Sequence, residues 1–244
     1  MTEALSASSQ LDALLHEMRV NHAIFRDTSY GPHYMETITG VSRLFLDLFT
    51  RSNFTPQSLD IVLPGGFFYE VIGALLAAKA AGIEETHITS LEIERSGYEI
   101  NKDVLKEIFR HPVSESRERI VMRDQDSPAT ITLQLADAGN PEQKFVGNSD
   151  AAMVFIGNSP TRLGYVFANW ATWGKEIQKP FLFAATATAL QGEVGVIGKL
   201  FAQGVERGGL TPVQGMNGTR NPHALQRPII SDMTHATVFA AVRR

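Results

Sequence analysis

Hydrophobic residues recur at helical intervals in two stretches near the amino terminus, and their spacing then changes. The stretches 11–20 and 36–50 carry apolar residues three to four positions apart, and a segment with Ser, Gly and Pro at 27–33 separates them. We therefore expect two helices before the first strand. From residue 59 onward, short apolar runs alternate with longer mixed stretches. This alternation is typical of a mostly parallel sheet covered by helices on both faces.

The alternation predicts a series of strands and helices in the rest of the chain. Helices are expected at 68–81, 96–110, 162–175 and 193–207. Strands are expected at 59–63, 87–93, 119–123, 151–156, 180–187, 210–214 and 234–242, and a short extra strand at 130–135 is left open. The last two strands have no helix between them, so they should form an antiparallel hairpin. The expected fold is α/β: a Rossmann-like, doubly wound, mostly parallel seven-stranded sheet with a C-terminal antiparallel hairpin and an N-terminal helical cap.

Composition narrows the kinds of partner that the protein could have. The chain has 244 residues, a formal net charge of -4 and no cysteine. The charge and the lack of basic runs argue against nucleic acid as a partner, and the missing cysteines remove disulfides and thiolate nucleophiles. No signal peptide precedes residue 10 and no apolar stretch reaches ~18 residues, so we expect no membrane span and a cytoplasmic location.

The clearest candidate site lies in the segment 59–102. A predicted strand ends in the turn Pro64-Gly65-Gly66, an apolar helix follows, and a second strand carries Glu92 near its end. Glycines let the backbone approach a ligand, and a helix start offers free N–H groups to an anion. An acid ~20 residues after such a glycine turn meets a ribose in nucleotide-binding βαβ units. The segment therefore predicts a nucleotide site, and the plainer alternative is an ordinary strand–helix turn followed by an exposed acid.

Four segments resemble, in their order and spacing, the class I S-adenosylmethionine-dependent methyltransferases. They match a glycine loop, a ribose-side strand end, an adenine-side strand end and a fourth strand with its turn, at 61–66, 90–94, 120–125 and 150–160. The resemblance implies S-adenosylmethionine as the cofactor. It also implies two parts of the chain, a helical cap or lid at 1–55 and a cofactor-binding Rossmann-like domain at 56–244.

The resemblance assigns the methionine and ribose contacts to the ends of the first two strands. Gly65 and Gly66 would approach the methionine part of the cofactor. Tyr69 would offer its ring to the sulfonium, with core packing as the alternative. Glu92 would accept hydrogen bonds from the ribose hydroxyls, and Glu94 competes for this role because it points to the same side of an extended strand.

The adenine contact is expected at the end of the strand 119–123. Asp124 would accept a hydrogen bond from the adenine amino group, and Gln125 and Asp126 are near-equal contenders. A solvated turn is the alternative for all three residues.

The turn 157–160 is the best candidate for catalysis. It follows a predicted buried strand and loosely resembles the Asn-Pro-Pro-Tyr turn of amino-methyltransferases. Asn158 and Ser159 would accept hydrogen bonds from an amine and orient it, and Asn158 would also contact the cofactor. The alternative is a polar loop in which Thr161 caps the next helix.

Three further candidates lie between the N-terminal helices. If this segment closes over the cofactor as a lid, Tyr30, His33 and Tyr34 would line the site and exclude water. His33 could then act as a general base. A surface or packing role is the plainer interpretation of a single histidine.

The absence of acids after the fourth and fifth strands bears on metal binding. Catechol-type O-methyltransferases hold a divalent metal there, but the matching positions here, 157–159 and 184–188, contain no carboxylate. We therefore expect a metal-independent, S-adenosylmethionine-utilising transferase for a small molecule, most simply methyl transfer to an amine or hydroxyl. One alternative is cyclisation of the cofactor through its own aminocarboxypropyl arm, which forms azetidine-2-carboxylate and releases methylthioadenosine. Another is a non-catalytic nucleotide-binding protein. A homodimer is left open.

Overall fold

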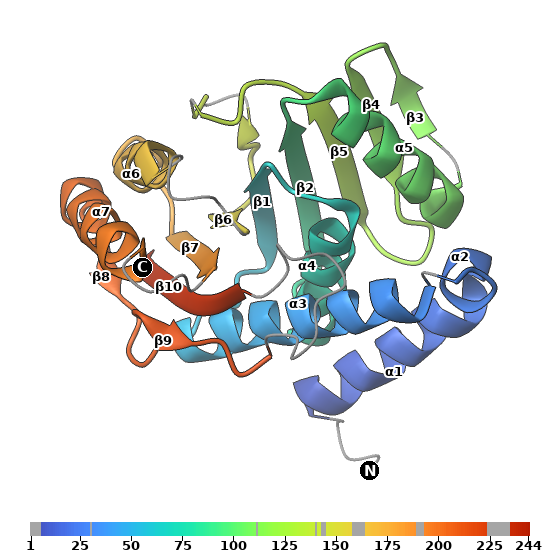
Figure 1. The fold of residues 1–244 in the computed structure, drawn as a ribbon, viewed down its shortest axis with the longest axis horizontal. Coiled ribbons are helices and arrows are strands. Elements are labelled where there is room, and N and C mark those ends of the chain that lie inside the picture. The colour runs from blue at the N-terminus through green and yellow to red at the C-terminus, as the bar shows by residue number, and fades with distance from the viewer. Residues whose placement is uncertain are drawn as a thin grey trace.

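A single large sheet forms the middle layer of the molecule, and helices cover both of its faces (Figure 1). The computed structural model describes residues 6–29, 31–110, 112–139, 141–142, 145–157, 164–188, 193–223 and 235–244. Within these residues the sheet has ten strands, in the order β3-β4-β5-β2-β1-β6-β7-β10-β8, with β9 pairing on β10.

The helices and strands alternate through most of the chain, as the sequence predicts. The helices are α1 (Ala7–Asn21), α2 (Ala23–Arg26), α3 (Gly31–Ser52), α4 (Phe68–Ala80), α5 (Arg95–Phe109), α6 (Gly164–Trp173) and α7 (Glu193–Gly208). The strands are β1 (Ser58–Pro64), β2 (Glu85–Glu92), β3 (Pro112–Glu115), β4 (Arg119–Arg123), β5 (Ala129–Leu135), β6 (Ala151–Ile156), β7 (Phe181–Thr188), β8 (Thr211–Pro212), β9 (Thr219–Arg220) and β10 (His235–Arg243).

The direction of the strands confirms the Rossmann-like, doubly wound prediction. β5, β2, β1, β6 and β7 are parallel neighbours, and β10 runs antiparallel to β7 and to β8. The chain builds outward from β1 through β2 to β5, and it then returns to the other side of β1 to build β6 and β7. The order therefore reverses between β1 and β6, and open α/β sheets bind ligands beside such a reversal, outside the carboxyl ends of the strands.

The strand predicted at 119–123 does not continue the parallel order of the sheet, and here the sequence prediction is wrong. β4 at 119–123 pairs antiparallel with β5, and β5 is the strand that joins β2 in parallel. β3 adds a further antiparallel strand outside β4, so the sheet has more strands than the seven expected. The carboxyl end of β4 consequently lies at the opposite edge of the sheet from the ends of β1 and β2.

The helices of the N-terminal segment belong to the same core as the sheet. α4 is apolar on almost every side because it lies between the sheet and α3, which contacts it closely. At this contact a Cβ atom at Gly73 would lie only 2.7 Å from Cγ1 of Val41, so a glycine is needed there. One buried cluster lies on this face, and α6 and α7 cover a second cluster that contains Trp170 and Phe183. Among the described residues, no helix is both long and apolar enough to cross a membrane.

Candidate functional site

The glycine turn after β1 is held in one conformation by two side chains from neighbouring elements. Gly65 has a positive φ of 69°, which favours glycine. A Cβ atom at Gly66 would lie 2.5 Å from the Cβ of Leu63, so a side chain does not fit there. The carbonyl of Gly66 accepts a 2.8 Å hydrogen bond from the hydroxyl of Ser90 and a 3.4 Å hydrogen bond from the amide of Asn101. These two hydrogen bonds tie the turn to β2 and α5.

Asn101 also completes the start of the helix that follows the turn. Its side chain is fully buried, and its Oδ1 accepts a 2.9 Å hydrogen bond from the N–H of Phe68. The first N–H groups of a helix have no partner within the helix, so this bond satisfies one of them. Sequence reasoning missed Asn101, which joins α5 to both sides of the turn.

The acid at the end of β2 is buried beside this turn. Glu92 is 7% exposed, and its Oε1 accepts a 3.0 Å hydrogen bond from the N–H of Glu94. A Cβ atom at Gly97 would lie 2.8 Å from Oε2, so the first turn of α5 leaves room for the carboxylate. Glu94 is exposed and stands at the N-cap position of α5, after the end of the strand. Ile93 lies between them with 64% of its surface exposed and offers an apolar surface at the same edge.

The loop after β5 supplies an acid that the sequence analysis did not single out. The N–H of Ala136 donates a 2.9 Å hydrogen bond to the carbonyl of Glu92. Asp137 follows, and its Oδ1 accepts a 2.7 Å hydrogen bond from the N–H of Gly139. The indole of Trp170 donates to the carbonyl of Ala138 at 2.8 Å, so α6 anchors this loop. Asp137 therefore occupies the strand end next to Glu92.

A second buried carboxylate, also missed from the sequence, lies where the turn meets β6. Glu70 is 3% exposed, and its Oε2 accepts a 2.7 Å hydrogen bond from the N–H of Phe67. A side chain at Gly157, directly after β6, would overlap its Oε1. Burial raises the pKa of Glu70 to about 7, and the negative charge of Glu92 adds to the rise. The site thus contains an acid that titrates near neutral pH.

Aromatic side chains cover the start of α4. Tyr34 of α3 packs edge-on against Phe68 with 5.1 Å between the ring centroids. Phe67 and Tyr69 stack with a centroid separation of 5.6 Å, and both are partly exposed. Tyr69 also packs edge-on against Phe68, so Tyr34 and Tyr69 both contact the first residue of the helix that follows the glycine turn. His33 is exposed on the first turn of α3, and no hydrogen bond or ion pair joins its side chain to these residues.

The structure does not bring Asp124 and Gln125 to this edge. Because β4 is antiparallel to β5, Asp124 lies at the opposite edge, where it forms an ion pair with Lys79 at the end of α4. Burial alone would raise the pKa of Asp124, but hydrogen bonds from Lys79 and Ser127 outweigh it and lower the pKa. Asp124, Gln125 and Asp126 line a cavity of about 560 Å³ between α1, α4, the end of α5 and the turn after β4. Within the turn, Oδ2 of Asp124 accepts a hydrogen bond from the hydroxyl of Ser127.

Three predicted catalytic residues lie outside the described residues: Tyr30, Asn158 and Ser159. The described part of the loop before β10 has a structural role. Oδ1 of Asn217 accepts a hydrogen bond from the N–H of Ala240 at 3.2 Å, and Nε2 of His223 lies 2.9 Å from Oδ2 of Asp47 in α3.

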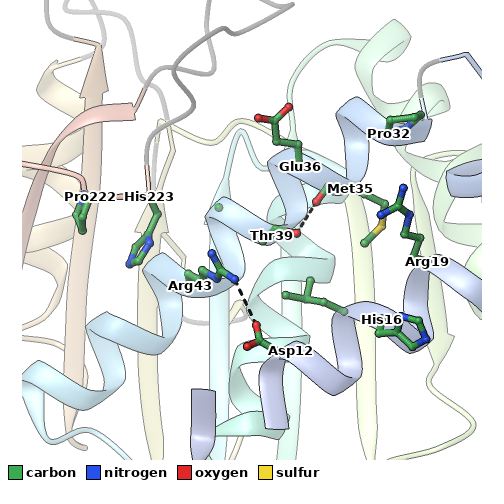
Figure 2. Close-up of a pocket in the computed structure, with 12 residues that line it drawn as sticks. Asp12, His16, Arg19, Pro32, Met35, Glu36, Thr39, Arg43, Pro222 and His223 are labelled. Carbon is green, nitrogen blue, oxygen red and sulfur yellow. Dashed lines mark hydrogen bonds and ion pairs between the residues drawn. The ribbon is translucent and has the colours of Figure 1, made fainter. Parts of the chain in front are cut away.

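Figure 2 shows the cavity of about 570 Å³ that lies between this loop, α1 and α3. Arg43 points across it toward Asp12 at 3.3 Å. Its walls carry both charge signs, from the side chains Asp12, His16, Arg19, Glu36, Arg43 and His223. In the parts of the chain that are described, no group of three or more acidic or histidine side chains is arranged to hold a metal ion.

Comparison with known proteins finds solved structures whose backbone fold is similar to that of this chain. No family model and no curated protein sequence matches this chain. The chain is similar to magnesium protoporphyrin IX methyltransferase from Synechocystis PCC 6803 with bound S-adenosylmethionine, at 11% identity and a TM-score of 0.47 over 100% of both chains. It is also similar to Aeropyrum pernix fibrillarin with natively bound S-adenosyl-L-methionine, at 14% identity and a TM-score of 0.45 over 82% of this chain and 74% of that chain.

A third similar structure is Trm1 from Pyrococcus horikoshii with S-adenosyl-L-methionine, at 13% identity and a TM-score of 0.47. This likeness covers 86% of this chain and 54% of that one. At such identities the likeness concerns the course of the backbone. The chemistry of this protein has to be argued from its own residues.

Proposed function

We propose that this protein binds S-adenosylmethionine and transfers its methyl group to an amine or hydroxyl of a small molecule, without a metal ion. The observation that carries the proposal is the convergence of a fixed glycine turn and a buried acid at one edge of the sheet. Gly65 and Gly66 end β1, and Glu92 ends the neighbouring strand β2. This edge lies beside the reversal of strand order, where open α/β sheets bind nucleotides.

Each part of the cofactor has a matching group at this edge. The buried carboxylate of Glu92 suits the two ribose hydroxyls, because charge-assisted hydrogen bonds to a carboxylate are strong. The exposed side chain of Ile93 and the loop with Asp137 suit the adenine ring. The glycine turn suits the methionine part, and the ring of Tyr69 suits the sulfonium. In this proposal Asp137 takes the role that the sequence suggested for Asp124.

The catalytic contribution is orientation of the nucleophile. The sulfonium is already an activated leaving group, so in-line attack requires mainly that the acceptor and the methyl carbon are held in line. The turn with Asn158 and Ser159 follows β6 and would hold the acceptor. The segment 1–55 would cover the site, and the contact of Tyr34 with Phe68 supports this arrangement.

A second candidate function is cyclisation of the cofactor by its own amine. The amine nitrogen would attack the γ-carbon of the aminocarboxypropyl arm. The C–S bond would break with its electron pair on sulfur, which gives methylthioadenosine and azetidine-2-carboxylate. A neutral amine is required, so a base must take a proton from the ammonium group. Glu70 beside the turn is the observation that favours this candidate, because its pKa of about 7 suits a base at neutral pH.

Incubation of the purified protein with S-adenosylmethionine alone separates the two candidates. Release of methylthioadenosine without an added acceptor, detected by liquid chromatography and mass spectrometry, would contradict methyl transfer. If the protein instead produces S-adenosylhomocysteine only when amines or alcohols are added, cyclisation is excluded. Binding without turnover under either condition would favour a non-catalytic nucleotide-binding protein.

Replacing the proposed ribose ligand should weaken cofactor binding. Glu92→Ala is expected to cost about 1.5–3 kcal/mol of binding free energy, because hydrogen bonds to a charged group are lost. Titration calorimetry with S-adenosylhomocysteine measures this loss. Asp124→Ala is the matched control and should leave the affinity within about twofold, since Asp124 lies at the other edge of the sheet. The reverse pattern would refute the proposed site.

A further inference from the structure

Two buried carboxylates lie beside the glycine turn of the proposed cofactor site. Glu70 approaches from the first turn of α4 and Glu92 from the end of β2, and the charge of Glu92 acts on Glu70. Neither acid forms an ion pair with a described basic residue. Burial of a charge is costly unless an opposite charge or hydrogen bonds compensate it. A positively charged ligand at this site would supply such compensation for either acid.

Each of these carboxylates has one oxygen to spare. Oε2 of Glu70 accepts the N–H of Phe67, and Oε1 of Glu92 accepts the N–H of Glu94. Among the described residues, the other oxygen of each acid accepts no hydrogen bond. The free oxygen of Glu70 lies against the backbone of Gly157, in the space that a side chain there would fill. This oxygen therefore lies where the first turn of α4 meets the end of β6.

We propose that Glu70 is the receptor for the ammonium group of the amino-acid arm of the cofactor. The inference rests on the proposed function, because it assigns a second anchor in the same site. S-adenosylmethionine carries an ammonium and a sulfonium, and both would lie near the glycine turn when Glu92 holds the ribose. An ammonium donates three hydrogen bonds, so it can use the free oxygen of Glu70 and neutralise its charge.

This assignment makes Glu70 a determinant of ligand choice. A ligand with an amino-acid arm would gain the charged contact, and a ligand that ends at the sulfur would not. The protein should therefore favour S-adenosylmethionine and S-adenosylhomocysteine over 5′-methylthioadenosine, which shares the nucleoside but lacks the arm. The capping bond to Phe67 fixes the carboxylate from the other side. A glutamine can make the same capping bond, so Glu70→Gln isolates the charge.

The test compares three ligands on three proteins by titration calorimetry at pH 8. The proteins are the wild type, Glu70→Gln and the control Glu107→Gln, which removes an exposed acid near the end of α5 that lies away from the site. We expect Glu70→Gln to weaken S-adenosylmethionine and S-adenosylhomocysteine by about 10- to 100-fold. Its affinity for 5′-methylthioadenosine should stay within about twofold of the wild type. Glu107→Gln should bind all three ligands as the wild type does.

The other outcomes are distinct from one another. An unchanged affinity of Glu70→Gln for S-adenosylmethionine overturns the role of Glu70 and leaves the proposed function standing. An equal loss for all three ligands also overturns it, because a distorted glycine turn would weaken the shared nucleoside. If the wild type binds none of the three, both the proposed function and this assignment fail.

Discussion

Lys179→Met is expected to lower the free energy of unfolding by about 3–5 kcal/mol, because it leaves a buried carboxylate without its partner. Asp60 lies on the central strand β1 and is 3% exposed. Its Oδ2 is 2.8 Å from Nζ of Lys179, and its Oδ1 accepts a 2.9 Å hydrogen bond from Ser149. Urea unfolding followed by circular dichroism at pH 7 measures the effect.

The geometry explains why this ion pair should contribute more to the free energy of unfolding than an ion pair on the surface. Nζ of Lys179 also donates to the carbonyls of Gly147 and Ser149, so one ammonium joins the segments before β6 and β7 to β1. Lys175→Met is the matched control, because Lys175 is exposed and should change stability by less than about 0.5 kcal/mol. A comparable loss in both variants would contradict the argument. Adding Asp60→Leu to Lys179→Met should recover much of the loss, since the unpaired charge is then removed.

The sequence predicted the parallel strands of the sheet where their apolar runs were unambiguous, and it failed at one hairpin. The runs 119–123 and 130–135 are similar in length and alternation, and periodicity does not reveal the direction of a strand. The structure pairs β4 with β5 antiparallel, and β5 continues the parallel order. This single reversal places Asp124 at the far edge of the sheet and leaves Asp137 at the strand end next to Glu92. The position expected for Asp124 thus depended on the direction predicted for its strand.

Only part of the candidate site could be predicted from the sequence. The positions of some residues follow from the strand pattern, and the positions of others depend on tertiary contacts. Gly65 and Glu92 end strands that the sequence located, so their positions at one edge followed from parallel pairing. Glu70 and Asn101 lie in helices, and the helical pattern alone does not reveal that their side chains bind next to the glycine turn. Only the tertiary structure shows these contacts. A weak signal existed for both. Glu70 is an acid at the third position of an apolar helix, and Asn101 interrupts the apolar stripe of α5 that includes Leu105.

Glu70→Gln is expected to stabilise the ligand-free protein at neutral and higher pH, and not under acid conditions. The folded protein raises the pKa of this carboxyl from its ordinary 4.5 to about 7, chiefly through burial and also through the charge of Glu92. Between these two values the folded state keeps a proton that the unfolded state releases, so stability falls as the pH rises. Above pH 7 the loss is complete and amounts to about 3 kcal/mol. Glutamine carries no such proton and avoids the loss.

Unfolding of the wild type and Glu70→Gln in urea between pH 4 and pH 8.5 tests this expectation. The difference in the free energy of unfolding should be close to zero near pH 4, grow through pH 5–7 and level off at about 3 kcal/mol. Glu94→Gln should give a small difference that does not change with pH, because Glu94 is exposed. A difference for Glu70→Gln that stays constant across the range would show that packing, and not the buried charge, separates the two proteins. A stabilised variant that also binds S-adenosylmethionine more weakly would mean that the protein gives up stability to keep a charged receptor for its ligand.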